Sequence, residues 1–151
     1  EVRFAAEILR SDFDVEADVW SVTSVNELTR DGQRATRWNM LNPTAAQRKP
    51  YITQALEGAE GPFIISTDNL KTYSEQLRAY IPGHYTVLGT EGFGRSDTRT
   101  QLRHFFEVNR YFVVVAALKS LADQGKIKAD VVAKAIKKFG IDPEKADPMS
   151  V

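Results

Sequence analysis

The fold is decided by the stretch Leu88-Gly89-Thr90-Glu91-Gly92-Phe93-Gly94-Arg95-Ser96-Asp97-Thr98-Arg99. An apolar run at 85–88 precedes it, and a helix-like run continues behind it to Val108. Three glycines within six residues allow backbone conformations that residues with a Cβ avoid. The polar group at 96–98 supplies side chains that cap helices. The stretch therefore predicts a strand, a shaped loop and a capped helix over 98–107, which is where ligands and partner surfaces usually meet an open α/β sheet.

Length and composition set the class of protein. The chain has 151 residues with 20 basic and 20 acidic side chains, so its net charge is zero. A dedicated nucleic-acid binder usually carries a basic excess, which argues against that class. The absence of cysteine excludes disulfides, thiolate nucleophiles and cysteine metal sites. No apolar run approaches the roughly 20 residues that a membrane-spanning helix needs.

Outward from the glycine stretch, the chain alternates strand-like and helix-like patterns. Ser24 and Glu27 have the spacing of a capping box, which marks a helix start. Asn42-Pro43 is expected to end that helix, and Asp31-Gly32 to weaken or kink it. In chain order the predicted elements are a helix at about 1–9, a strand at 15–23, a helix at 24–40, a short helix at 50–58, a strand at 63–65, a helix at 70–80, a strand at 85–88, helices at 98–107, 110–124 and 129–139, and a tail from 141.

Strands that alternate with helices indicate parallel pairing with helices on both faces of the sheet. We therefore expect one α/β domain over 1–151, built as three layers around a mostly parallel sheet. The last helices, at about 110–140, are expected to form a helical C-terminal extension. The run 111–118 is apolar on every side, which favours a buried helix although its valines would also suit a strand.

The glycine loop is the first candidate for chemistry. Its spacing is G-x-x-G-x-G, which is not the dinucleotide fingerprint, and no P-loop lysine follows. Arg95 and Arg99 lie near a predicted helix N-terminus, where an anion could bind. Against this, Asp97 is the expected N-cap and Glu91 would repel an anion. A structural turn or domain-contact loop is favoured over a phosphate site.

Other candidate residues give weaker signals. His84 and His104 have no metal-ligand spacing, so a structural or surface role is favoured for each. Ser96 lies outside any nucleophile elbow and has no histidine close in sequence. The C-terminal lysines are mixed with acidic residues, which favours a solvated face over an acidic docking surface. Trp20 and Trp38 are most simply core or interface residues. Taken alone, the residues indicate an α/β domain without a convincing catalytic constellation.

Several motifs, in the same order along the whole chain, closely resemble the C-terminal domain of bacterial homodimeric pyruvate dehydrogenase E1 components, which are similar to transketolase. The motifs are Val87-Leu88-Gly89-Thr90-Glu91-Gly92-Phe93-Gly94-Arg95-Ser96-Asp97-Thr98-Arg99 with Arg103-His104-Phe105-Phe106-Glu107-Val108, Ala17-Asp18-Val19-Trp20-Ser21-Val22-Thr23-Ser24, Arg37-Trp38-Asn39-Met40-Leu41, Tyr111-Phe112-Val113-Val114-Val115-Ala116-Ala117-Leu118 and Lys138-Phe139-Gly140-Ile141-Asp142.

The resemblance implies a cytoplasmic enzyme that uses thiamine diphosphate and Mg²⁺ to decarboxylate pyruvate and pass the acetyl unit to a lipoyl group of E2. It also implies a cofactor held between two earlier domains across a dimer interface, so no catalytic, cofactor or metal residue is assigned here. The expected partners are the other E1 domains, a second E1 chain and E2, and neither nucleic acid nor a membrane. The expected contact loop with the neighbouring domain comprises Glu91, Gly92, Phe93, Gly94, Arg95, Ser96, Asp97 and Arg99.

The chain departs from this family in one respect. The family domain normally opens with an extra strand before the helix that begins here at Glu1-Val2-Arg3. We expect an open sheet position, and hence self-association or binding of a foreign strand. Three alternatives stay open: a free-standing module that docks E2 or a regulator, a small anion-binding protein, and a domain of transketolase or of another 2-oxo acid E1.

Overall fold

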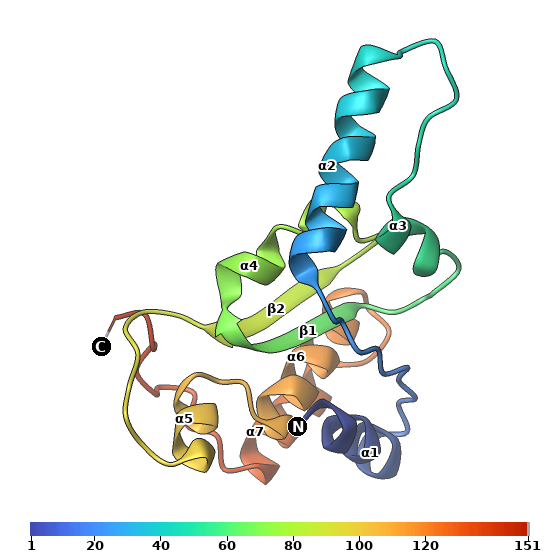
Figure 1. Ribbon diagram of the computed structural model, residues 1–151. Coiled ribbons are helices and arrows are strands. Elements are labelled where there is room, and N and C mark those ends of the chain that lie inside the picture. The colour runs from blue at the N-terminus through green and yellow to red at the C-terminus, as the bar shows by residue number, and fades with distance from the viewer. Residues whose placement is uncertain (151) are drawn as a thin grey trace.

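A computed structural model describes residues 1–150 as two parallel strands enclosed by helices (Figure 1). The elements in chain order are α1 (Val2–Phe13), α2 (Val25–Leu41), α3 (Tyr51–Ala55), β1 (Phe63–Leu70), α4 (Lys71–Glu75), the 3₁₀ turn η1 (Arg78–Tyr80), β2 (Tyr85–Thr90), α5 (Arg99–Phe105), α6 (Arg110–Asp123) and α7 (Ala129–Lys138). None of the helices within 1–150 is long and apolar enough to cross a membrane.

The sheet separates two apolar clusters. β1 and β2 pair in parallel, with Phe63 opposite Tyr85 and Ile65 opposite Val87. Those four side chains face a cluster that Ile52 of α3 and the fully buried Leu77 complete. The alternate residues Ile64 and Leu88 face α1, α6 and α7 on the other side. Figure 1 shows α2 and α4 on one face of the sheet and the α1, α6 and α7 group on the other. The predicted class, α/β with a parallel sheet covered on both faces, is confirmed.

The predicted strand at 15–23 is wrong. The structure places this segment as an irregular connection between α1 and α2, with Trp20 62% exposed. Alternating polarity alone does not make a strand, because a strand needs a neighbour to take its backbone hydrogen bonds. Within residues 1–150, β1 pairs only with β2, so its other edge carries no strand.

The predicted helix at 70–80 is also corrected. β1 continues to Leu70, which pairs with Thr90, and only then do the short α4 and η1 follow. Leu70 and Tyr73 are about half exposed, whereas Leu77 is fully buried. Pairing with β2 therefore outweighs the helical spacing of the apolar residues, since local patterns yield to tertiary contacts.

Two of the predicted helix starts are confirmed by their caps. The Ser24 hydroxyl accepts a hydrogen bond from the Glu27 backbone N–H at 3.3 Å, and the Asn109 carboxamide oxygen accepts from Tyr111 N–H at 3.0 Å. α2 runs without a break past Gly32. The Tyr80 ring packs against this glycine so closely that a Cβ at position 32 would lie 2.4 Å from a ring carbon, so the packing there requires glycine. The helix is therefore not interrupted at Asp31-Gly32.

The apolar run at 111–118 is helical, as predicted. α6 packs against α1, α7 and the sheet, so it needs no polar side. The Ser120 and Thr86 hydroxyls lie 3.1 Å apart and join α6 directly to β2. α6 thus forms the layer on one face of the sheet, and the division of the chain into a domain and a C-terminal extension stays a prediction.

Candidate functional site

The loop between β2 and α5 is the best candidate for a functional surface. It is exposed from Gly92 to Thr98, and the Phe93 side chain is 86% exposed. Its base is tightly packed, because a Cβ on Gly89 would lie 2.9 Å from the Lys71 Cα. Gly92 has a φ of 71°, and a Cβ there would lie 2.6 Å from the Pro148 carbonyl oxygen. The glycines therefore hold a compact loop that presents an apolar ring to its surroundings.

Three charged side chains of the loop, those of Glu91, Arg95 and Asp97, have partners within the chain. Glu91 pairs with Lys71 at 3.2 Å, and the Arg95 guanidinium lies 4.9 Å from the centre of the Phe105 ring. Thr98 is the N-cap of α5 in place of the expected Asp97, whose carboxylate instead accepts from the Thr98 N–H at 2.6 Å. The Thr98 hydroxyl accepts a hydrogen bond from the Gln101 backbone N–H at 3.3 Å. These contacts favour a shaped turn over an anion pocket.

The carboxyl edge of the sheet, where α/β folds usually bind ligands, is covered by the C-terminal tail (Figure 1). The hollow that remains there has a volume of about 50 Å³ between Lys71, Glu91, Glu107 and Asp147. Lys145 fastens the tail, because its ammonium group donates to the Phe105 carbonyl at 2.9 Å and to Glu107 at 3.0 Å. Binding pockets for cofactors typically measure 300–1,000 Å³, so this edge does not fit a diphosphate cofactor.

His84, His104 and Lys138 have structural contacts. The His84 carbonyl accepts the Phe63 N–H at 2.8 Å, and the His104 ring lies 5.6 Å from that of Phe112. Within residues 1–150, no three His, Asp or Glu side chains gather as a metal site would require. Lys138 reaches back to Asp12 at 2.8 Å, so this C-terminal lysine ties α7 to α1.

Sequence reasoning missed one charged cluster, which lies at the start of α1. The Glu1 carboxylate accepts from the Arg110 guanidinium at 3.0 Å, from the Arg110 backbone N–H at 2.8 Å and from Arg103 at 3.4 Å. These partners are 102 and 109 positions away, so no local motif could reveal them. Phe4 packs under Arg110, with 4.3 Å between the guanidinium carbon and the ring centre.

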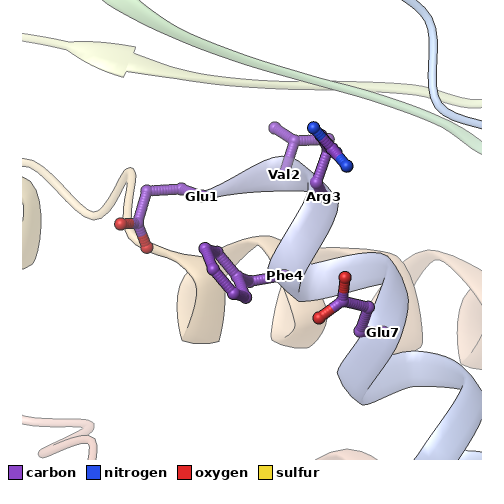
Figure 2. Close-up of a pocket in the computed structure, with 5 residues that line it drawn as sticks. All are labelled: Glu1, Val2, Arg3, Phe4 and Glu7. Carbon is purple, nitrogen blue, oxygen red and sulfur yellow. The ribbon is translucent and has the colours of Figure 1, made fainter.

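A surface hollow of about 470 Å³ borders the N-terminal part of α1 and is lined by Glu1, Val2, Arg3, Phe4 and Glu7. Figure 2 shows how these five side chains lie. The Glu1 carboxylate lies apart from Arg3 and Glu7 in this view. Because Glu1 is held by two arginines, it joins α1 to the start of α6. The cluster is thus a structural tie between distant parts of the chain.

This tie predicts a pH-dependent stability. Hydrogen bonds from the Arg110 guanidinium, opposed by partial burial and aided by the Arg110 backbone N–H, lower the pKa of Glu1 from 4.5 to about 2. A lowered folded-state pKa means that the stabilisation is present above pH 4.5 and is lost as the pH falls towards 2. We expect Glu1→Gln to lower the free energy of unfolding by about 2 kcal/mol at pH 7, since one pKa unit is worth about 1.4 kcal/mol and the rim of the cluster is solvated.

Urea unfolding at pH 7, 4 and 2.5 measures the difference in free energy of unfolding between the parent and Glu1→Gln. This difference should become smaller between pH 4 and pH 2.5. Glu7→Gln is the control, because Glu7 is exposed on the same helix and makes no ion pair within residues 1–150. Equal losses in the two variants, or a Glu1 effect that is independent of pH, would contradict the assignment.

The chain is similar to known proteins along its whole length. The family model of the transketolase-like TK C-terminal domain matches residues 1–109. The chain is 52% identical over 151 residues to the pyruvate dehydrogenase E1 component of Cupriavidus necator, covering 100% of this chain and 17% of that protein. It is 55% identical over 150 residues to the Pseudomonas aeruginosa protein of the same name, covering 99% and 17%. The E1 component of Escherichia coli is 55% identical over 148 residues, covering 97% and 16%. The chain thus spans about a sixth of the length of these curated relatives.

Proposed function

We propose that this chain, which belongs to the family of transketolase-like C-terminal domains, is the C-terminal domain of a pyruvate dehydrogenase E1 component and serves its assembly rather than its chemistry. The observation that carries the proposal is the 52–55% identity to E1 components, which extends past residue 109 through the C-terminal helices. The parent enzyme would decarboxylate pyruvate and transfer the acetyl group to the lipoyl group of E2.

The exposed glycine loop supports an assembly role. Phe93 projects an apolar ring from a loop whose base is fixed by Gly89 and Gly92. A large apolar side chain on a rigid exposed turn is typical of a residue that another surface covers. The loop from Glu91 to Arg99 is proposed to contact the neighbouring domain of the E1 chain, with a second E1 chain and E2 as the wider partners.

The carboxyl edge of the sheet does not fit thiamine diphosphate and Mg²⁺. Glu91 and Glu107 are each paired with a lysine there, and the hollow of about 50 Å³ is too small for the cofactor. The proposal therefore places the cofactor in other domains of the parent enzyme and assigns no catalytic step to the residues described here.

A domain exchange tests the proposal. In the Escherichia coli E1 component, the 148 matching residues are replaced by this chain, and dimer mass and pyruvate consumption are measured. We expect a dimer whose rate stays within about tenfold of the parent, a change of about 1.4 kcal/mol in the barrier. A folded chimera that neither dimerises nor consumes pyruvate would overturn the proposal.

Two further measurements sharpen this test. Phe93→Ser in the chimera should weaken the contact between this domain and its neighbouring E1 domain by roughly tenfold, because it removes about 1.5 kcal/mol or more of apolar burial, and limited proteolysis between the two domains would measure the change. Tyr51→Ser is the matched control, since Tyr51 is another exposed aromatic residue, 66% exposed, outside the loop. Titration calorimetry of the isolated chain with thiamine diphosphate and Mg²⁺ should give no saturable binding, and saturable binding would contradict the non-catalytic role.

A further inference from the structure

The outer half of α2 and the loop that follows it form an arm, defined here as residues 33–50. Figure 1 shows the arm standing away from the rest of the molecule, with the loop returning alongside α2 towards α3. The Asn39 carboxamide binds the Arg48 backbone in both directions, donating at 2.9 Å and accepting at 2.8 Å. The Arg48 guanidinium also lies 4.0 Å from the centre of the Trp38 ring. These contacts hold the loop of the arm in a defined conformation against α2.

The arm has an unusual charge for a chain of zero net charge. It carries Arg34, Arg37, Arg48 and Lys49 and no acidic side chain. Arg34 and Arg37 are exposed and make no ion pair within residues 1–150. Met40 is 70% exposed beside them. The surface thus combines free positive charge with an apolar anchor.

A complementary surface lies on the connection between α1 and α2, which we call the acidic strip, residues 14–22. It carries Asp14, Glu16 and Asp18 and no basic side chain, followed by the exposed residues Val19 and Trp20. The three acidic side chains are exposed and have no ion-pair partner within residues 1–150. In Figure 1 the arm points away from the strip, so one molecule does not join the two surfaces.

We propose that the arm of one copy docks on the acidic strip of a second copy, with Met40 against the apolar end of the strip. Two surfaces of opposite charge on the same chain permit a reciprocal two-fold pair, in which each copy supplies one arm and one strip. The match of charge and apolar surface favours a second copy over other acidic partners. This inference rests on the two surfaces and does not require the proposed E1 function.

Charge reversal tests the pairing. Sedimentation of the chain should show a dimer that weakens as the salt concentration rises, because screening acts on exposed charges. Arg34→Glu with Arg37→Glu should weaken the dimer by at least about tenfold, and Asp14→Lys with Asp18→Lys should do the same. An equimolar mixture of these two double variants should associate again, since each supplies the surface that complements the other.

The control is Lys134→Glu with Lys137→Glu on α7, which makes the same change of charge on exposed residues elsewhere and should leave the dimer intact. A monomer at all concentrations would overturn the proposal. The proposal would also be overturned if the strength of self-association changed neither with salt concentration nor in either charge-reversal variant. That result would indicate main-chain pairing at the free edge of β1. Binding of single-stranded DNA or anionic vesicles through Arg34 and Arg37 without self-association would assign the arm to another partner and would also overturn it.

Discussion

Gly89→Ala should destabilise the chain by about 3 kcal/mol and lower its Tm by roughly 10 °C. Gly89 lies in β2 where the end of β1 turns into α4, and a Cβ there would lie 2.9 Å from the Lys71 Cα, 3.0 Å from the Lys71 nitrogen and 3.1 Å from the Asn69 carbonyl oxygen. All three atoms belong to the backbone. A flexible side chain cannot move aside to relieve the contact, so the two strands must separate or the turn must shift.

Gly94→Ala is the matched control. It adds the same methyl group five residues further along the same stretch, where no atom lies within 4 Å of the new Cβ. Its stability should stay within about 0.5 kcal/mol of the parent. Thermal unfolding followed by circular dichroism measures both variants. Equal Tm values for Gly89→Ala and the parent would show that the close approach of β2 to Lys71 does not constrain the sequence.

Gly89 and Gly92 show which contacts a sequence pattern can predict and which it cannot. The strand, loop and helix around Gly89 were predictable because apolar runs, glycines and capping residues act within a few positions. The loop's contact with Pro148 was not, because the tail reaches Gly92 through tertiary packing alone. The predicted strand at 15–23 was wrong although its residues alternate as those of a strand do. A strand also needs a partner, and within residues 1–150 no neighbouring strand pairs with this segment.

The candidate site divides in the same way. The exposed loop could be located from its glycines and its polar group, and capping by Thr98 is one residue from the expected Asp97. The Glu1 cluster could not be located, since Glu1, Arg103 and Arg110 carry no shared motif and meet only once α1 lies against α6. The arm has a readable charge, but its projection from the body depends on how the loop packs against α2.

Leu118→Ala should have the other large effect, about 3–4 kcal/mol. Leu118 is fully buried in α6 between α1, α7 and the sheet, and removal of a buried leucine side chain leaves a cavity as well as losing apolar burial. Leu77→Ala is the matched change on the opposite face of the sheet, where Leu77 is equally buried. Urea unfolding should give similar losses for the two variants.

The pair of leucine variants also decides whether 110–140 is an appended extension or a layer of the domain. Ile64 and Leu88 of the sheet pack against the apolar cluster that contains Leu118, and the Ser120 hydroxyl is hydrogen-bonded to that of Thr86. A cavity at Leu118 should therefore destabilise the sheet as well. Hydrogen exchange should then show amides of β2 and of α7 losing protection together in both variants, as in one cooperative unit. If Leu118→Ala exposes only α6 and α7 while β2 stays protected, the helices form an independent extension. Val114→Ala, also fully buried in α6 but losing fewer atoms, keeps the comparison possible if Leu118→Ala does not fold.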